Sequence, residues 1–448
     1  MSADRHSQRI TRGRARHRTA KTTLWASAML GPLALASNAA FGQADSLALS
    51  DDTPLDEDAG IRVPAGFDAK VFADDLGRAR HVAVRDNGDV YVALRERAEG
   101  GGIVALRDED GDGAAERTEY FGEHAGTGMA IHEGFLYASS DSAIYRYPLP
   151  EGDALVPESG PETVVEGFPE QRSHASKAFA FDDSGNLYVN VGAPSNACQA
   201  DDRTLGSPGQ EPCPLLEDHA GIRRFDASKT DQTFAAGQRF LTGTRNIVAL
   251  DWNPEAGALY FAMHGRDQLH DLFPDLYTVE QSAELPAEEL HAAREGADYG
   301  WPYTYWDHQA GARVVAPEYG GDGETVAEEE YQVPLLTFPG HWAPNDLLFY
   351  TAEGFPAEAQ GGAFIAFHGS WNRAPLPQRG YNVVFVPFEG AEPAGDWSVF
   401  ADGFTGAEVL ADSDDAEHRP MGLAQGPDGA LYITDSVRGR VWRVTHEG

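Results

Sequence analysis

The sequence Gly-Thr-Arg-Asn-Ile-Val-Ala-Leu-Asp-Trp at residues 243–252 continues, after a short polar break, into Gly-Ala-Leu-Tyr-Phe-Ala-Met-His-Gly-Arg-Asp at residues 257–267. In both halves apolar side chains alternate with smaller or polar ones, which predicts two antiparallel strands joined by a short turn. The two outer ends of a hairpin are neighbours in space. Arg245 and Asn246 should therefore lie beside residues 264–267, with polar side chains gathered at one rim.

The second half of this pattern recurs along the chain as a glycine followed by an apolar residue and an aromatic one. The copies are Gly88-Asp-Val-Tyr, Gly134-Phe-Leu-Tyr, Gly185-Asn-Leu-Tyr, Gly257-Ala-Leu-Tyr, Gly361-Gly-Ala-Phe and Gly429-Ala-Leu-Tyr. Turn-forming residues such as Asp, Asn and Gly precede several copies. Six repeated hairpins predict an all-β fold, a six-bladed β-propeller that forms a single domain over residues 61–448. A β-sandwich is the alternative, but it does not require the hairpin to repeat so often.

The widest interval between copies, residues 260–364, is expected to hold loops inserted on one rim of the propeller. Within it, residues 286–294 are the one segment whose pattern could form a short amphipathic helix.

Residues 1–43 have the pattern of a secretory signal peptide, with a basic start, an apolar run over 22–35 that contains Pro32, and small residues up to Gly42. The run is short for a membrane span, so we expect none in the mature chain, although an uncleaved anchor is the alternative. Residues 44–60 are acidic and are expected to form a flexible mature N-terminus. These features predict a periplasmic or secreted protein.

The chain is strongly acidic, with 71 Asp and Glu against 34 Lys and Arg and a formal charge of −37. Removing the predicted leader, which carries seven positive charges and one negative, brings the charge to −43. Such a surface repels nucleic acid and anionic lipid, so we expect no nucleic-acid partner.

Two cysteines, Cys198 and Cys213, lie within one loop rich in Gly, Pro and Asp. In an exported protein such a pair predicts a disulfide that clamps the loop. No Cys-x-x-Cys-His motif is present, so the chain carries no covalent c-type haem and an electron acceptor would be a separate molecule.

An acidic loop fits the spacing of a calcium-binding loop but lies between two segments that look like strands. Its candidate ligands are Asp108, Asp110, Asp112 and Glu119. A structural calcium site and a plain solvated turn are equally supported by this pattern.

His174, Arg245 and Arg419 precede the third, fourth and sixth hairpins in corresponding positions. In a propeller such positions converge on one mouth of the central channel. A histidine near neutral pH beside fixed cations suits proton abstraction coupled to charge development on an oxidant.

Three further histidines occupy rim positions of the fourth, fifth and sixth units, namely His264, His368 and His418. They could be zinc ligands, although their lack of close pair spacing makes this the weaker interpretation.

At these residues the sequence resembles the pyrroloquinoline quinone (PQQ)-dependent sugar dehydrogenases, the glucose/sorbosone dehydrogenase family, and most closely its sorbosone dehydrogenase-like branch. The matching motifs are Gly-Thr-Arg-Asn-Ile-Val-Ala-Leu at 243–250, Tyr-Gly-Trp-Pro-Tyr at 299–303, His-Gly-Ser-Trp-Asn-Arg at 368–373 and Arg-Pro-Met-Gly at 419–422. The resemblance runs from about Ile61 to the C-terminus and implies a six-bladed propeller that binds PQQ and calcium.

The resemblance also implies residue roles. His174 resembles the base that takes the anomeric proton, and Arg245 and Asn246 resemble the pair that contacts the quinone carbonyls. The remaining cofactor contacts implied are His368 or nearby Arg373, where soluble glucose dehydrogenases use a lysine, and Arg419, whose guanidinium suits a carboxylate. The backbone carbonyls of Gly265, Arg266 and Tyr299 resemble the ligands of the catalytic calcium.

The resemblance implies an oxidoreductase that oxidises an aldose or related sugar or aldehyde by hydride transfer to calcium-polarised PQQ. Two alternatives stay open. One is a propeller that binds carbohydrate or a protein partner without redox chemistry. The other is a calcium-dependent lactone hydrolase, which would require a metal site rich in side-chain ligands.

Overall fold

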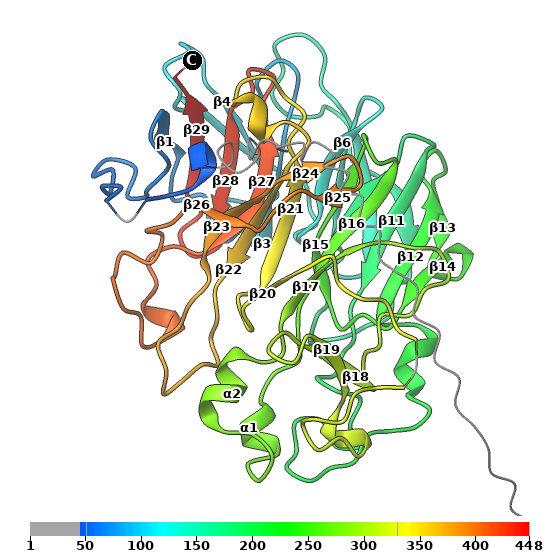
Figure 1. Cartoon of the computed structure of the whole chain (residues 1–448). Helices are drawn as coiled ribbons and strands as arrows, with labels where there is room; N and C mark the ends of the chain where they lie inside the picture. Colours follow the sequence, from blue (N-terminus) through cyan, green and yellow to red (C-terminus); the bar gives the residue numbers. More distant parts are fainter. Residues whose placement is uncertain (1–44, 51, 329, 448) are drawn as a thin grey trace, which may run out of the picture. The chain divides into compact units, whose positions relative to one another are not determined.

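The computed structural model describes residues 45–50, 52–328 and 330–447, and the predicted leader lies outside them. The unit Gln43–Gly448 contains six small antiparallel sheets, the blades of a β-propeller (Figure 1). The fold predicted from the hairpin repeat is therefore confirmed.

Blades 1 to 3 come from the first half of the chain. Blade 1 contains β2 (Ala79–Val84), β3 (Val90–Ala98), β4 (Gly101–Arg107) and β5 (Arg117–Phe121). Blade 2 contains β6 (Met129–His132), β7 (Phe135–Ser139), β8 (Ala143–Pro148) and β9 (Glu162–Glu166), with β13 (Gln232–Thr233) added at its edge. Blade 3 contains β10 (Phe179–Phe181), β11 (Asn186–Val191), β12 (Gly221–Asp226) and β14 (Gln238–Thr242).

Blades 4 to 6 come from the second half. Blade 4 contains β15 (Ile247–Asn253), β16 (Ala258–Met263), β17 (Glu288–Ala292) and β20 (Leu336–Phe338). Blade 5 contains β21 (Pro344–Phe349), β22 (Ala363–His368), β23 (Tyr381–Val386) and β26 (Ser398–Ala401). Blade 6 contains β27 (Pro420–Gln425), β28 (Leu431–Asp435), β29 (Val441–His446) and, from the other end of the domain, β1 (Phe67–Ala73).

The six glycine-aromatic motifs all lie at the turn into the second strand of a blade. Each therefore marks the inner hairpin, for example β15–β16, in which Trp252 pairs with Leu259. The aromatic residue points into a packed layer, and Tyr91, Tyr137 and Tyr260 are almost fully buried. The motif recurs because every blade needs one large side chain here to pack against a neighbouring blade.

The hydrophobic clusters lie between blades as well as within them. One cluster joins Val92 and Val104 of blade 1 to Tyr432 of blade 6. Sheet-on-sheet burial of this kind supplies the contacts that a four-stranded blade cannot make alone.

The pairing of β1 with β29 closes the ring with strands from both ends of the domain. The residues before β1 also pack onto it, since Leu47 and Ala59 are buried in the cluster that contains Trp442. The backbone N–H of Leu49 donates to the carbonyl of Val399 at 2.8 Å. The described part of this segment is thus docked on the propeller, in contrast to the flexible terminus that its acidic composition predicts.

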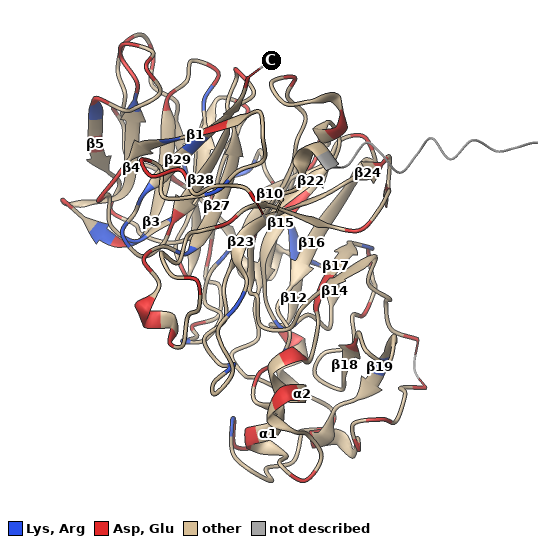
Figure 2. Ribbon diagram, turned by 60° about the vertical axis from the view of Figure 1, so that its left-hand side comes forward, with Lys and Arg blue, Asp and Glu red and all other residues tan. Residues whose placement is uncertain are grey.

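The long interval between blades 4 and 5 holds inserted structure, as predicted. It contains α1 (Leu269–Leu272), α2 (Val279–Glu284) and the hairpin β18 (Thr304–Asp307) and β19 (Ala312–Val315), which lie together on one side of the blades in Figures 1 and 2. The helix considered for 286–294 is wrong, because this segment forms β17 and pairs with both β16 and β20. Pairing of β17 with a strand on each side overrides the weak amphipathic pattern of the sequence.

The remaining elements are short. They are η1 (Asp45–Leu47), η2 (Pro214–Glu217), η3 (Phe234–Ala236), η4 (Pro317–Tyr319), η5 (Ala357–Ala359), η6 (Ser413–Asp415) and the hairpin β24 (Phe388–Glu389) and β25 (Glu392–Pro393). Within the described ranges, no helix has the length and apolar character to cross a membrane.

Candidate functional site

The innermost strands of the six blades, β2, β6, β10, β15, β21 and β27, surround a central channel with a cavity at each end. The first cavity, of about 320 Å³, lies where these strands begin. We call it the arginine cavity, because its lining includes Arg80, Arg95, Arg172, Arg203, Arg245 and Arg419. The second, of about 560 Å³, is lined by later residues of the same strands, and we call it the aspartate cavity after Asp86, Asp251 and Asp346.

The arginine cavity contains five of the side chains proposed from the sequence for catalysis or cofactor contact, together with Gly265. They are His174, Arg245, Asn246, His368 and Arg419. The predicted proximity of the two hairpin ends is also confirmed, since the N–H of His264 donates to the carbonyl of Asn246 at 3.0 Å. Antiparallel pairing of β15 and β16 brings these residues together.

Arg245 is held by a buried polar network. Its Nη2 donates to Oδ2 of Asp267 at 2.7 Å and its Nη1 to the carbonyl of Gly265 at 2.9 Å. Asp267 also accepts from Nη2 of Arg203 at 2.8 Å and from Nδ2 of Asn372 at 2.9 Å. The donors to Asp267 hold its carboxylate in place, and Asp267 and the Gly265 carbonyl in turn fix the direction of the Arg245 guanidinium before any ligand binds.

The titration of this network follows from burial and charge. Burial raises the pKa of Asp267, but the charge of Arg245 and the contact with His341 outweigh it and hold the pKa well below 3.8. Burial lowers the pKa of His341, but the Asp267 carboxylate outweighs this and raises it above 6.5. Asp267 is therefore a carboxylate at neutral pH, surrounded by cationic and amide donors.

His174 is fixed as a neutral imidazole. Its Nδ1 donates to the carbonyl of Ala193, and because a carbonyl can only accept, the ring keeps the lone pair on Nε2. Burial, with a smaller effect from the charge of Arg245, lowers its pKa to about 3. The half-buried imidazole is therefore unprotonated at neutral pH, and Nε2 is the ring atom that is available to accept a proton.

The backbone around His174 is tightly constrained. His174 has a φ of 52°, in the left-handed region that side chains rarely adopt. A side chain at Gly192 would place its Cβ 2.7 Å from the Cβ of His174 and 2.6 Å from Oδ1 of Asn246. Gly192 therefore allows the segment before β10 and the start of β15 to approach each other, a role that the sequence alone did not reveal.

Arg419 lies at the blade 5–blade 6 side of the cavity. Its Nε donates to the carbonyl of His368 at 3.0 Å and its Nη2 to the carbonyl of Gly369 at 2.7 Å. Burial lowers its pKa below 12.5, and within the described residues it has no carboxylate at ion-pair distance. A partly buried guanidinium bonded only to carbonyls is suited to receive an anion.

Three residues proposed from the sequence do not line the arginine cavity. Arg373 is buried and forms an ion pair of 2.6 Å with Glu284 of α2. The Arg266 side chain is buried in an ion pair with Glu318, and Tyr299 is packed in the core with its hydroxyl donating to the carbonyl of Ala292. Of the three carbonyl ligands proposed for calcium, only Gly265 belongs to a residue that reaches the cavity, and that carbonyl accepts from Arg245.

The zinc interpretation finds no support in the part of the chain that the structure describes. His264 and His368 line the arginine cavity, whereas His418 is hydrogen-bonded to Asp435 at 2.9 Å. Within the described residues, one cluster of side chains lies close enough together to bind a shared metal ion, and it consists of Asp108, Asp110, Asp112 and Glu116.

The acidic loop lies between β4 and β5, as predicted. Glu119 is not part of the cluster, because it lies on β5 and accepts from Nε of Arg117 at 2.7 Å, and Glu116 takes its place. Asp108 accepts the backbone N–H groups of Gly111 and Gly113, at 2.6 and 2.9 Å, and so stabilises the turn.

The predicted disulfide between Cys198 and Cys213 is present and links residues 15 positions apart. The clamped loop reaches the site through Arg203, which donates to Asp267 at 2.8 Å. Asn196, two residues before Cys198, both donates to and accepts from the backbone of Asp267 at 2.9 Å. The loop therefore supports the residue that orients Arg245.

Sequence reasoning missed several residues of the arginine cavity, because they come from separate blades and match no short motif. They are Arg80, Arg95, Arg172, Arg203, Glu288 and His341. Asp267, Trp371 and Asn372 also line the cavity and lie within the quoted motifs, but no individual role was predicted for them from the sequence. Asp267 follows Arg266 in the first motif, and its position at the hairpin rim was the available signal.

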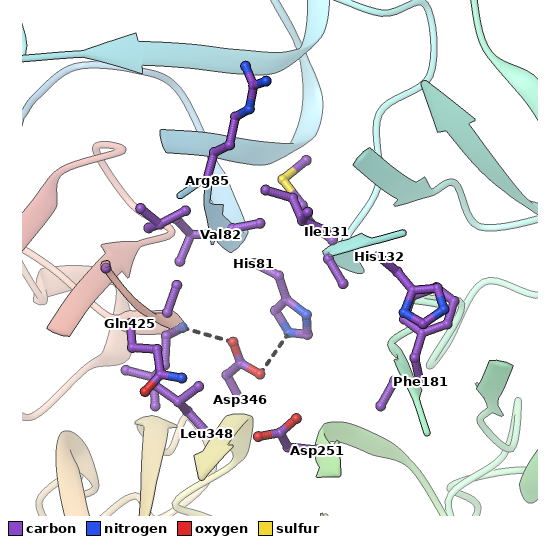
Figure 3. Close-up of a pocket in the computed structure, with 18 of the residues that line it drawn as sticks. His81, Val82, Arg85, Ile131, His132, Phe181, Asp251, Asp346, Leu348 and Gln425 are labelled. Atoms are coloured by element: carbon purple, nitrogen blue, oxygen red, sulfur yellow. Dashed lines mark hydrogen bonds and ion pairs between the residues drawn. The ribbon is translucent and has the colours of Figure 1, made fainter. Parts of the chain in front are cut away.

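The aspartate cavity has a different character. Asp251 of blade 4 accepts the N–H of Phe349 of blade 5 at 2.8 Å, and Asp346 of blade 5 accepts the N–H of Leu423 of blade 6 at 2.8 Å. Figure 3 shows Asp346 linked to His81, whose Nε2 lies 3.9 Å from Oδ1. Burial raises the pKa of Asp251 to about 7 and that of Asp346 well above 3.8, because it disfavours the charged form of both carboxyls.

Comparison with known proteins identifies a family that matches this chain. The TrAA12-like family model matches residues 61–447. The chain belongs to the TrAA12-like family. The match covers all six blades and every residue of the arginine cavity.

Two curated relatives match shorter segments. The chain is 32% identical over 279 residues to the pyrroloquinoline quinone-dependent pyranose dehydrogenase of Coprinopsis cinerea, covering 53% of this chain and 36% of that protein. It is 27% identical over 208 residues to an uncharacterized protein of Borreliella burgdorferi, covering 46% and 48% of the two chains. The chain thus spans less than half the length of these relatives in the matched regions.

Solved structures share the fold at low identity. The holo form of the pyranose dehydrogenase PQQ domain from Coprinopsis cinerea has a TM-score of 0.69 at 20% identity, covering 88% of this chain and 99% of that chain. The apo form of the soluble aldose sugar dehydrogenase from Escherichia coli has a TM-score of 0.53 at 17% identity, covering 84% and 99%.

Proposed function

We propose that this protein is a PQQ-dependent sugar dehydrogenase that oxidises an aldose or a related sugar or aldehyde in the arginine cavity. The observation that carries the proposal is the pairing of a neutral, anchored His174 with a preoriented Arg245 in one cavity. Membership of the TrAA12-like family supports the same chemistry.

The donors of the arginine cavity fit a flat, carboxylate-bearing quinone. The buried Nε of Arg245 is a donor that lacks a hydrogen-bond partner within the described residues, and the buried Oδ1 of Asn372 is an acceptor that lacks one. Arg245 and Asn246 would contact the quinone oxygens, while Arg419, with His368 beside it, would contact a carboxylate. When bound, PQQ supplies the two-electron oxidant that amino-acid side chains cannot supply.

His174 would remove the proton from the sugar hydroxyl while a hydride leaves the carbon that bears this hydroxyl. Its Nδ1–H, held by the carbonyl of Ala193, fixes the tautomer that leaves Nε2 as the acceptor. Arg245 would stabilise the negative charge that develops on the oxidant, and Asp267 keeps the guanidinium in place at no reorganisation cost.

Calcium enters this proposal with less support. Of the three backbone carbonyls proposed as its ligands, that of Gly265 already accepts from Nη1 of Arg245, while the side chains of Arg266 and Tyr299 are buried away from the arginine cavity. We therefore derive no step through a calcium ion.

We further propose that the protein is exported to the periplasm or secreted, and that it passes electrons to a separate acceptor. The leader pattern in residues 1–43 and the disulfide support export.

Dye-linked oxidation of a panel of aldoses by the PQQ-loaded protein tests the proposal. The account expects sugar-dependent dye reduction that requires PQQ and falls by about 10² to 10⁴ in His174→Gln, the usual contribution of a general base. Wild-type turnover that the substitution leaves unchanged would remove His174 from the mechanism. Saturable sugar binding without any turnover would favour the non-catalytic propeller.

A further inference from the structure

The arginine cavity carries more positive charge than the cofactor contacts use. Six arginines and no lysine line it, against two carboxylates, Asp267 and Glu288. The first carboxylate already pairs with Arg245 and Arg203, and burial raises the pKa of the second to about 7, so that it is only partly charged. The cavity is therefore cationic at neutral pH.

This charge contrasts with the rest of the molecule. The chain has a formal charge of −37, and Figure 2 shows acidic residues at many places along the ribbon. A cationic concave site in an acidic protein focuses the field and attracts anions selectively into the site.

Three of the arginines, Arg80, Arg95 and Arg172, are not among the proposed cofactor contacts, and two of them are connected to the segment that carries His174. Arg80 lies on β2, and its Nε donates to Oγ1 of Thr127 at 3.0 Å. The Thr127 hydroxyl in turn donates to Oγ of Ser176 at 3.0 Å, two residues after His174. Arg172 precedes His174 by two residues and is exposed at the mouth of the cavity.

The partners of these three guanidiniums leave them able to bind an anion. Arg95 has one ion pair, of 2.8 Å, with the partly exposed Asp141. Arg80 and Arg172 have no carboxylate at ion-pair distance in the described part of the chain. Burial, followed by the charges of Arg95 and Arg78, lowers the pKa of Arg80 to about 9, so a neighbouring anion would relieve an unfavourable arrangement.

We infer that the substrate is an anionic sugar, a uronic acid or a similarly charged saccharide, whose carboxylate is bound by Arg80, Arg95 and Arg172 while its anomeric hydroxyl faces His174. The inference rests on the proposed function and adds the substrate class. The reaction would be the one proposed above: the C1 hydroxyl would give its proton to His174, C1 would give a hydride to the bound quinone, and the product would be the lactone.

The first test compares matched sugars that differ only at C6, using the PQQ-loaded protein. D-galacturonate should have a kcat/KM about tenfold above that of D-galactose at low ionic strength, with the difference mainly in KM. The preference should shrink at about 0.5 M salt, where exposed charges are screened.

Substitutions locate the effect. Arg172→Gln and Arg95→Gln should each reduce the preference about fivefold and leave D-galactose oxidation nearly unchanged. Arg97→Gln is the matched control, because Arg97 is exposed on the same strand as Arg95 but outside the cavity. Equal efficiency with both sugars, or a preference that survives both substitutions, would overturn the inference while leaving the proposed function intact.

A binding measurement separates this inference from the oxidation itself. Methyl α-D-galactopyranosiduronate cannot be oxidised at C1, so its binding by calorimetry does not depend on turnover. Tighter binding than the neutral methyl galactoside, lost in Arg172→Gln, would support the inference even if no sugar were oxidised. Equal binding of the two glycosides would overturn it.

Discussion

The two ends of the propeller channel are built from the same six strands and differ in almost every property that matters for chemistry. At the arginine cavity, side chains from loops and strand starts form a network around Asp267 with the donors Arg245, Arg203 and Asn372. At the aspartate cavity, Asp251 and Asp346 bind backbone N–H groups of neighbouring blades. The larger cavity is thus the structural one, and the smaller one has the groups that can move a proton and stabilise charge.

The largest expected difference between the two ends is catalytic. His174→Gln should lower kcat by about 10² to 10⁴, because it removes the proposed base. His132→Gln at the aspartate cavity should leave kcat within about twofold, since that ring stacks on Phe181 and serves no step of the reaction. Steady-state kinetics on both variants make the comparison, and equal losses would show that the channel ends are not functionally distinct.

The next effect concerns the network that orients Arg245. Asp267→Asn should lower the free energy of unfolding by about 3 to 5 kcal/mol, because it leaves the buried Arg245 without its counter-charge. Urea denaturation measures the change.

Asp218→Asn is the matched control for Asp267→Asn. Asp218 is exposed and its Oδ1 lies 3.1 Å from Nη2 of Arg223, so its removal should cost no more than about 1 kcal/mol. Equal costs for the two substitutions would contradict the assigned network.

The sequence predicted the propeller because its periodic signal is local. Gly257 and Tyr260 fix a turn and a packed aromatic within four residues, and that unit recurs in each blade. The same stretch predicted the proximity of Asn246 and His264, since hairpin pairing is also local. The contact of Arg203 with Asp267, by contrast, joins residues 64 positions apart through a disulfide loop, and no pattern of spacing encodes it.

The departures have similar causes. The motif predicts that Arg373 contacts the cofactor, but its side chain forms an ion pair with Glu284 of α2 instead. The side chain of Arg266 likewise forms an ion pair with Glu318. A motif predicts where a backbone lies, whereas the direction of a long cationic side chain depends on carboxylates supplied by distant insertions.

The disulfide should have an intermediate effect that reaches only the arginine cavity. Replacing both Cys198 and Cys213 with Ser should cost about 3 kcal/mol of stability, the value expected for a loop of this length. PQQ affinity should fall as well, because Arg203 and Asn196 support Asp267. Calorimetric unfolding and PQQ titration measure the two effects, and an unchanged PQQ affinity would show that the loop does not support the site.

The two ends should also respond to pH with opposite sign. The pKa of Asp267 is depressed in the folded protein, so its contribution to stability is present above about pH 4 and lost as the pH falls. The pKa of Asp251 is raised to about 7, so its contribution is present at acidic pH and lost as the pH rises through 7.

Asp251→Asn should therefore flatten the stability profile between pH 5 and 8, by no more than about 2 kcal/mol. Urea midpoints at the two pH values test this. A steeper profile in the variant would contradict the assignment.

The smallest effect is expected at the acidic loop, which is remote from both cavities. Asp110→Asn should change the free energy of unfolding by less than about 0.5 kcal/mol without added metal, because the side chain is exposed. Calorimetry with and without calcium measures the change. A large calcium-dependent stabilisation in the wild type that the variant loses would identify the loop as a structural metal site.

The account depends most directly on the arginine cavity being the cofactor site, and a calorimetric titration of the purified protein with PQQ tests this. The account predicts saturable binding of one PQQ per chain, weakened about tenfold to hundredfold in Arg245→Gln by loss of a charge-assisted contact and unchanged in His132→Gln. Absence of saturable binding, or equal affinity in wild type and Arg245→Gln, would contradict it.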